Sequence, residues 1–186
     1  LEKLEKCIYL DNSSYLTVAH HTNLNLNGDW TIEAWINITE FNSGSQSIIV
    51  RKPGDSNDYD SNFTLELNPW WGNVLHGFYF SNEENRINVT DMSPSLNKWY
   101  HVAFIRDVSN SKISITVHDE DWNEVSSNSQ NLSNTDVLLN TKDLRIGEAF
   151  DGYIDELRIS NVVRSFSPPS PPTFPTELDQ IGRAHV

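Results

Sequence analysis

The feature of this sequence that most restricts its fold is a series of short runs of alternating apolar and polar residues. Clusters of Asn, Gly, Asp, Ser and Pro separate the runs, and no helical period is sustained beyond a turn or two. In "KISITVH", Ile113, Ile115 and Val117 alternate with polar residues, as in a strand with one face on a core. The pattern predicts an all-β, two-sheet antiparallel β-sandwich or jelly roll. The predicted strands cover residues 15–18, 30–38, 47–52, 62–68, 74–81, 99–106, 112–118, 143–146 and 153–160.

The charge of the chain restricts its partners. Among 186 residues, 26 acidic and 13 basic side chains give a formal net charge of -13. So acidic a surface repels a nucleic-acid backbone, an anionic membrane or a polyanionic glycan, whereas neutral sugars and cations are compatible with it. We therefore expect no nucleic-acid partner, and the lack of a long apolar run predicts no membrane insertion.

The ends of the chain indicate a piece of a longer protein. Cys7 is the single cysteine, so no internal disulfide can form, and the chain starts at Leu1 without a signal-like segment. After one domain at residues 1–165, the five prolines of "SFSPPSPPTFPTELD" predict an extended linker over residues 166–180. The last residues, 181–186, read "IGRAHV" and resemble one reading frame of a sequencing adapter, as expected of a non-native scar on assembled metagenomic DNA. We expect flanking domains in the same longer chain.

Three segments carry a family resemblance. They are "LDNSSYLTVAHHTNLNLNGDWTIEAWINI" at 10–38, "LNKWYHVAFIRD" at 96–107 and "DLRIGEAFDGYIDELRISNVVRS" at 143–165. Together they resemble the laminin-G-like jelly-roll family of the concanavalin A-like lectin and glucanase superfamily. The resemblance implies a β-sandwich that recognises a glycan, such as a cell-surface polysaccharide, or another surface partner. One departure is "ITVHDEDWNEV", where a longer acidic turn at 119–124 replaces the family's tight Asn-Gly hairpin.

A weaker resemblance concerns the tail. The segment "ISNVVRSFSPPSPPTFP" is similar to the junctions that follow such domains in tail and fibre proteins of bacteriophages. It implies an adhesion module with an extracellular or virion-surface location. The alternative is coincidence, because the segment is short and rich in proline.

Two groups of acids are candidate calcium ligands. In "FDGYIDELRIS", Asp155 shares the parity of Tyr153, Leu157 and Ile159, so strict alternation places its carboxylate with the apolar set. A buried carboxylate needs a partner, and the family resemblance implies a structural calcium between Asp155 and Asp11 on the neighbouring first strand. The alternative is that backbone N–H groups of the N-terminal strand bind Asp155 without an ion.

The second group lies in "GDSNDYDSN" at 54–62, where Asp58 and Asp60 are the weaker metal candidates. The spacing fails the EF-hand pattern, because a phenylalanine stands where the glycine is required. A solvated turn is the alternative.

Aromatic residues in turns are candidates for a sugar platform. "NPWWGN" has the Pro and Gly of a connection between strands, so at least one of Trp70 and Trp71 should reach solvent, where an indole can stack on a pyranose. Trp122 and Tyr59 join them as ligand-binding candidates. The alternative is that these rings fold back over a sheet edge. Trp30, Trp35 and Trp99 lie in predicted strands and are expected in the core or at its edge.

The sequence favours a non-catalytic module. Glucanases carry a pair of carboxylates on one strand, and the nearest match is "DEDWNE", with Asp119, Asp121 and Glu124 in a turn that cannot easily hold such geometry. No motif of a nucleophilic or zinc enzyme occurs. We therefore expect a carbohydrate- or surface-recognition module. The alternatives are a glycoside hydrolase and a purely structural spacer.

Overall fold

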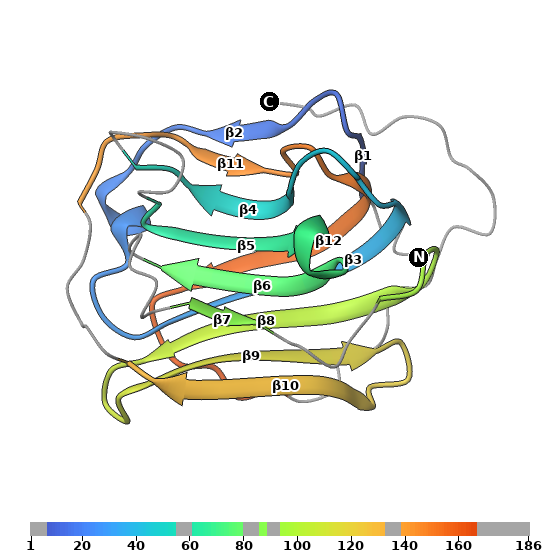
Figure 1. Cartoon of the computed structure of the whole chain (residues 1–186). Helices are drawn as coiled ribbons and strands as arrows, with labels where there is room; N and C mark the ends of the chain where they lie inside the picture. The colour runs from blue at the N-terminus through green and yellow to red at the C-terminus, as the bar shows by residue number, and fades with distance from the viewer. Residues whose placement is uncertain (1–6, 55–60, 80–85, 89–93, 133–138, 167–186) are drawn as a thin grey trace, which may run out of the picture.

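The computed structural model describes residues 7–54, 61–79, 86–88, 94–132 and 139–166. These residues form two six-stranded antiparallel sheets that pack face to face (Figure 1). Sheet A has the order β1-β12-β3-β8-β9-β10, and sheet B has the order β2-β11-β4-β5-β6-β7. The all-β sandwich predicted from the alternating runs is therefore confirmed. The strands are β1 (Ile8–Asp11), β2 (Leu16–Val18), β3 (Trp30–Glu40), β4 (Ser47–Lys52), β5 (Phe63–Asn68), β6 (Val74–Tyr79), β7 (Arg86–Asn88), β8 (Trp99–Asp107), β9 (Lys112–Asp119), β10 (Glu124–Asn131), β11 (Leu144–Ile146) and β12 (Asp151–Ser160), with single 3-10 turns η1 (Thr22–Asn25) and η2 (Pro69–Trp71).

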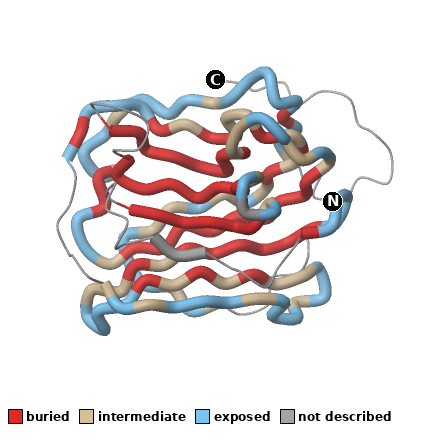
Figure 2. The backbone as a smooth tube through the Cα atoms, in the orientation of Figure 1, coloured by how far each residue is buried: buried red, intermediate tan, exposed pale blue. Residues whose placement is uncertain are grey.

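The nine predicted strands are all present, and their ends agree to within two residues where both ends are described. The prediction omitted β1, β7 and β10. Strand β10 reads "EVSSNSQN", and all its residues are exposed or half-buried because it forms the outer edge of sheet A (Figure 2). An edge strand with so little apolar surface carries no alternation of apolar and polar residues. No helix within the described ranges is long and apolar enough to cross a bilayer.

The core lies between the two sheets and is built from the alternate residues of their inner faces (Figure 2). Trp30 is at its centre, with ring centroids 4.8 Å from Phe104, 6.1 Å from Phe63 and 6.3 Å from Tyr79. Gly77 faces Phe104 so closely that a Cβ would lie 2.9 Å from that ring. These contacts confirm Trp30 as a core residue and fix the separation of the sheets at this point.

Strand β12 changes its buried face halfway along. Opposite β3, Ile154 pairs with Ile36 and Ile159 pairs with Ile32, so five steps along β12 match four along β3. The extra residue forms a β-bulge, in which Glu156 has a φ of 48°. Before the bulge, odd-numbered residues face outward, and after it they face the core. The prediction that Asp155 points with the apolar set is therefore wrong, because strict alternation does not survive the bulge.

The carboxylate of Asp155 has a local partner. It lies on the outer side of sheet A and accepts a hydrogen bond of 2.8 Å from the backbone N–H of Glu156 in the bulge. Strand β1 does pair with β12, as the resemblance implied, but Asp11 stands opposite Asp151. At about 3.3 Å per residue, Asp155 lies about 13 Å farther along the strand.

Asp11 is engaged in a turn of its own. Its carboxylate accepts bonds from the N–H and Oγ of Ser13 and from the Oγ of Ser14. These hydrogen bonds lower the pKa of Asp11 below its ordinary value. Across the described ranges, no group of three or more His, Cys, Asp or Glu side chains is arranged to hold a metal ion. The register thus separates Asp11 from Asp155, and calcium binding by this chain stays a prediction.

Candidate functional site

A row of polar and aromatic side chains crosses the outer face of sheet A. Asp155 is paired with Trp35, Trp35 with His101, and His101 with His118, from β12 to β9. The neighbouring residues Ile36, Val102 and Val117 belong to the core, so the members of the row face outward by alternation. Trp35 is nevertheless only 1% exposed. Side chains from outside the sheet must therefore cover it.

Trp122 is one of those covering side chains, because the turn between β9 and β10 folds its indole back over the row. The ring stacks on His118 at a centroid distance of 4.5 Å and an interplanar angle of 12°. It also lies 4.9 Å from the His101 ring and 6.0 Å from the Trp35 ring. One turn residue thus joins three side chains of the row.

The local sequence explains this position of Trp122. The carboxylate of Asp119 accepts hydrogen bonds from the backbone N–H of Asp121, at 3.0 Å, and of Asn123, at 2.8 Å. The Trp122 N–H donates to the Asp119 carbonyl at 3.0 Å, and Trp122 has a left-handed φ of 64°. The hydrogen bonds from Asn123 lower the pKa of Asp119. The side chains of Asp119 and Asn123 therefore stabilise the turn that directs the indole toward the sheet.

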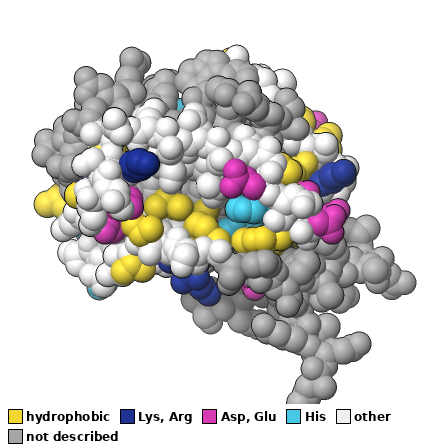
Figure 3. Space-filling model, turned by 90° about the horizontal axis from the view of Figure 1, so that it is seen from below, with side chains coloured by type: hydrophobic (Ala, Val, Ile, Leu, Met, Phe, Trp, Pro, Cys, Tyr) yellow, Lys and Arg dark blue, Asp and Glu magenta, His cyan; other side chains and the backbone are white. Residues whose placement is uncertain are grey.

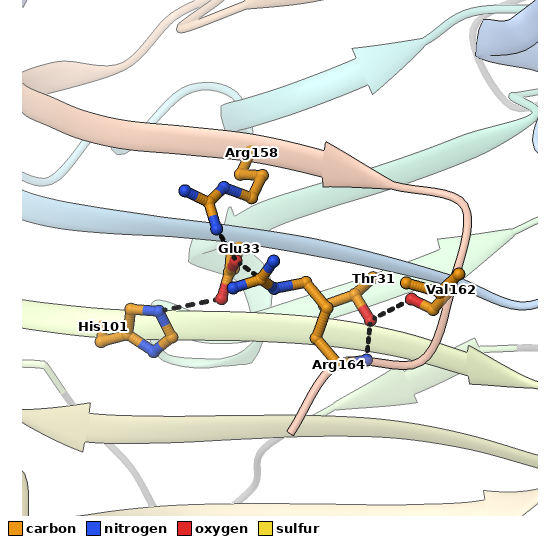
Figure 4. A network of polar contacts seen from close by, with 6 residues as sticks. All are labelled: Thr31, Glu33, His101, Arg158, Val162 and Arg164. Atoms are coloured by element: carbon orange, nitrogen blue, oxygen red, sulfur yellow. Dashed lines mark hydrogen bonds and ion pairs between the residues drawn. The ribbon is translucent and has the colours of Figure 1, made fainter. Parts of the chain in front are cut away.

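Glu33 is the charged centre of the same face (Figure 4). It lies on β3, two residues before Trp35, and its side chain is 8% exposed. Its carboxylate is 2.8 Å from Nε of Arg164, 3.5 Å from Nε2 of His101 and 3.9 Å from Nη1 of Arg158. Three cationic or hydrogen-bonding groups from three segments therefore converge on one acid.

These partners keep Glu33 ionised. Burial by itself raises the pKa of the carboxyl, but the hydrogen bond from His101 and the charges of Arg164, His101 and Arg158 outweigh it. The net result is a pKa below the ordinary value. For His118, burial and the nearby His101 lower the pKa, so the ring under Trp122 is neutral at pH 7.

The chain beyond β12 returns across the outer face of sheet A (Figure 4). We name Val162–Phe166 the C-terminal strap. The Thr31 hydroxyl donates to the carbonyl of Val162 at 2.9 Å and accepts from the N–H of Arg164 at 3.0 Å. The ring of Phe166 meets the His101 ring edge to face, with centroids 5.5 Å apart. These contacts reach one residue beyond the predicted end of the domain at residue 165.

A cavity of about 160 Å³ lies among these groups. Its floor is formed by strands β3 and β8, and its walls by the bulge of β12, the C-terminal strap and the Trp122 turn. The face seen from below carries His side chains beside hydrophobic and acidic ones (Figure 3). We refer to the cavity and its lining as the outer-face site. Its lining residues are Glu33, Trp35, His101, Trp122, Glu156, Arg158, Arg164, Ser165 and Phe166.

Three buried ring nitrogens near the site have no hydrogen-bond partner within the described parts of the chain. They are Nε1 of Trp35, Nδ1 of His101 and Nδ1 of His118. Nε2 of His101 faces the carboxylate of Glu33, so this nitrogen carries a proton and acts as the donor. A buried polar atom without a partner costs about 1–3 kcal/mol.

Of the four aromatic candidates for a sugar platform, the two whose side chains are described lie apart, on different sheets. Trp122 lies in the outer-face site, whereas Trp70 is 61% exposed in the connection between β5 and β6 of sheet B. Tyr59 and the weaker metal candidates Asp58 and Asp60 fall outside the described residues, as does the side chain of Trp71. For all four aromatic candidates the sugar-binding role stays a prediction.

Sequence reasoning missed most of the outer-face site. Glu33 and Trp35 share one parity in "WTIEAWINI", opposite to the isoleucines, and His101 stands between core residues in "WYHVAF". This outward parity was the available signal. The positions of Arg158 and Arg164 carried no signal, because a bulge and a chain reversal bring them to Glu33.

Comparison with protein families decides the relationship of the chain. The family model described as concanavalin A-like lectin/glucanases superfamily matches residues 10–167. The chain belongs to this superfamily. The resemblance drawn from the three sequence segments is therefore confirmed. No curated protein sequence matches this superfamily member.

Solved structures share the fold of this lectin/glucanase-superfamily domain. The IT-sialidase CBM40 of Ruminococcus gnavus, bound to α2,3-sialyllactose, has 12% identity and a TM-score of 0.66, covering 87% of this chain and 92% of that chain. The Trypanosoma rangeli sialidase has 14% identity and a TM-score of 0.57, covering 87% and 26%. The leech intramolecular trans-sialidase complexed with 2,7-anhydro-Neu5Ac has 12% identity and a TM-score of 0.61. The match covers 87% of this chain and 26% of the leech enzyme. The chain thus corresponds to about a quarter of each of the two larger enzymes.

Proposed function

We propose that this domain is a non-catalytic carbohydrate-recognition module and that a sugar binds at the outer-face site. The observation that carries the proposal is the placement of the Trp122 indole beside the Glu33, Arg158 and Arg164 cluster around one cavity. Sugar rings have an apolar C–H face and a rim of hydroxyl groups. An aromatic wall next to charged hydrogen-bonding groups is complementary to both features.

The polar groups of the cavity suit hydroxyl ligands. Arg158 is 57% exposed and comes no closer than 3.9 Å to Glu33 in their ion pair, and a guanidinium has five N–H donors to offer a ligand. Glu33 offers a carboxylate that stays ionised and accepts hydrogen bonds. The formal charges of the cavity lining balance, because it contains two acids, Glu33 and Glu156, and two cations, Arg158 and Arg164.

The structural relatives support the same class of ligand. A CBM40 module with this fold was solved with α2,3-sialyllactose and with α2,6-sialyllactose. This chain covers 92–94% of the length of those modules, so the comparison is between units of the same size. A unit of this size and fold is thus able to bind a glycan by itself.

The acids of the domain favour binding over hydrolysis. A glycoside hydrolase needs one carboxylic acid with a raised pKa beside a second carboxylate. Glu33, the buried acid of the cavity, has a lowered pKa and is paired with Arg164. Asp119, the first acid of "DEDWNE", is engaged in the turn by backbone and Asn123 donors. Neither acid is available as a proton donor.

The test is a glycan array followed by titration calorimetry with any glycan that binds. Trp122→Ala should abolish binding detected with the unaltered chain, whereas the matched variant Trp70→Ala should bind as before. Incubation with the same glycans should release neither reducing ends nor sialic acid. If the glycans are cleaved and Glu33→Gln abolishes the cleavage, the domain is a hydrolase and the proposal of a binding module is wrong. An array without any signal would favour a structural spacer.

We also propose that the module works outside the cell or on a virion surface as part of a longer protein. The Pro-rich composition of residues 166–180 supports a linker to a further domain. Recovering the DNA on both sides of the coding fragment tests this setting. Adjacent fibre, adhesin or hydrolase domains are expected, and an intracellular enzyme on either side would contradict it.

A further inference from the structure

We infer that the C-terminal strap, Val162–Phe166, is a wall of the outer-face site, in which Arg164 positions Glu33 and Phe166 helps to determine which glycans fit. The inference rests on the proposed glycan-binding function and adds to it a site that depends on chain beyond the last strand. The strap supplies three of the residues that line the cavity, Arg164, Ser165 and Phe166. Without the strap, the site would keep the Trp122 turn and the bulge of β12 but would lose this wall.

The strap is anchored to β3 by one buried side chain that both donates to it and accepts from it. The Thr31 hydroxyl is fully buried and uses its donor on the carbonyl of Val162 and an acceptor on the N–H of Arg164. Removing the strap would leave this buried hydroxyl without both partners. The anchor fixes the backbone directly before the residues that reach the cavity.

Arg164 holds the carboxylate of Glu33 in place. Its Nε lies 2.8 Å from the carboxylate, whereas the mainly exposed Arg158 lies 3.9 Å away and His101 3.5 Å away. The closest cation therefore comes from the strap. A side chain as buried as Glu33 needs such a partner to stay ionised at the cavity floor. Arg164 thus acts on a ligand through Glu33 as well as by lining the cavity.

Phe166 and Trp122 border the same imidazole. The Phe166 ring is 5.5 Å from the His101 ring, and the Trp122 ring is 4.9 Å from it. The two rings come from segments far apart in the sequence and supply the aromatic surface of the cavity lining together with Trp35. The cavity of about 160 Å³ exists with the strap in position. The strap is therefore a wall of the site and does not fill it.

The binding test compares four variants of the full chain with the unaltered chain. The probes are α2,3-sialyllactose and lactose, measured by calorimetry, together with the strongest glycan from the array. Phe166→Ala and Arg164→Gln should each weaken binding about tenfold. Arg164→Lys should recover part of the loss, because it keeps the charge near Glu33. The control is Val163→Ser, a half-exposed strap residue that does not line the cavity, and it should bind within about twofold of the unaltered chain.

A second measurement does not depend on a ligand. In NMR spectra, Phe166→Ala should shift the ring resonances of His101, and Arg164→Gln should raise the pKa of Glu33, whereas Val163→Ser should do neither. A chain that ends after Asn161 should show both changes while keeping a cooperative thermal transition.

The outcomes separate the inference from the proposed function. Unchanged binding in Phe166→Ala and Arg164→Gln would overturn the inference and leave glycan recognition intact. Tighter binding after removal of the strap would mean that it occupies the site and is not its wall. If no glycan binds to any variant, the proposed function fails, and the NMR comparison alone decides whether the strap forms the cavity: unchanged His101 and Glu33 signals would refute it.

Discussion

Two tryptophans, Trp70 and Trp122, both lie in turns between strands but have different environments in the fold. Each lies in a connection between antiparallel strands, and each turn is shaped by a preceding side chain that accepts a backbone N–H, Asn68 for Trp70 and Asp119 for the Trp122 turn. Trp70 is 61% exposed and makes no ring contact with the described residues. Trp122 stacks on His118 and contacts His101 and Trp35.

The difference lies in the sheet beneath each turn. The Trp122 turn ends a hairpin of sheet A, whose outer face carries a row of aromatic and imidazole rings. The Trp70 turn connects β5 and β6 of sheet B. A turn tryptophan becomes part of a site where the neighbouring strands present partners for its ring. Of the three rings that distinguish the Trp122 turn, His118 is a sequence neighbour, whereas Trp35 and His101 lie on strands distant in sequence.

The largest expected effect belongs to Trp122. Trp122→Ala removes three ring contacts and uncovers Trp35 and His101, so the free energy of unfolding should fall by about 2 kcal/mol. Chemical denaturation of the unaltered chain and the variant measures it. A loss as small as that of an exposed residue would mean that Trp122 and Trp70 are equivalent in stability.

A smaller loss should follow when the Trp122 turn is loosened. Asp119→Ala removes the acceptor for the N–H groups of Asp121 and Asn123 and should destabilise the fold by about 1 kcal/mol. Tryptophan fluorescence should shift to longer wavelength because the indole is then less firmly held on the sheet. The neighbouring exposed acid Glu120 serves as the control, and Glu120→Ala should leave emission and melting temperature unchanged.

The imidazole under Trp122 should make stability depend on pH. The pKa of His118 lies below its ordinary value of 6.5, so the folded state takes up this proton less readily than the unfolded state. Its contribution to stability is complete above about pH 6.5 and is lost as the pH falls through the lowered pKa. Melting temperatures between pH 8 and pH 5 should therefore fall less steeply in His118→Gln. Parallel curves for the two proteins would contradict this.

The smallest effect is expected at Trp70. Trp70→Ala removes a mainly exposed ring without ring partners among the described residues, so stability should change by less than about 0.5 kcal/mol. The same denaturation series as for Trp122→Ala provides the comparison. A loss of 2 kcal/mol or more would show that the two turns are supported equally and that the contrast drawn between them fails.

Much of the fold could be predicted from local patterns. "KISITVH" and "WTIEAWINI" show their buried faces by alternation, and they form β9 and β3 with those faces in the core. Strand β10 could not be predicted in this way, because "EVSSNSQN" has no apolar face to reveal. Strand β10 is held in the sheet by its backbone pairing with β9, which its side-chain pattern does not indicate.

The candidate site was less accessible to such patterns. Trp122 could be singled out because an aromatic residue in an acidic turn is unusual, but its direction depends on the ring row of sheet A. Glu33, His101, Arg158 and Arg164 converge from β3, β8, β12 and the strap. No spacing within the sequence encodes a contact between four separate segments.

The sequence by itself determined that the chain forms a β-sandwich, because a period of two in side-chain direction follows from the geometry of each strand. It determined the core face of most strands for the same reason. Only the tertiary structure decided the direction of Asp155. The bulge in β12 arises from its pairing with β3. Strand β12 contains one residue more than β3 between the paired positions, so both Ile154 and Ile159 stay on the core side. That adjustment turns Asp155 outward, a consequence of the partner strand that the sequence of β12 does not contain.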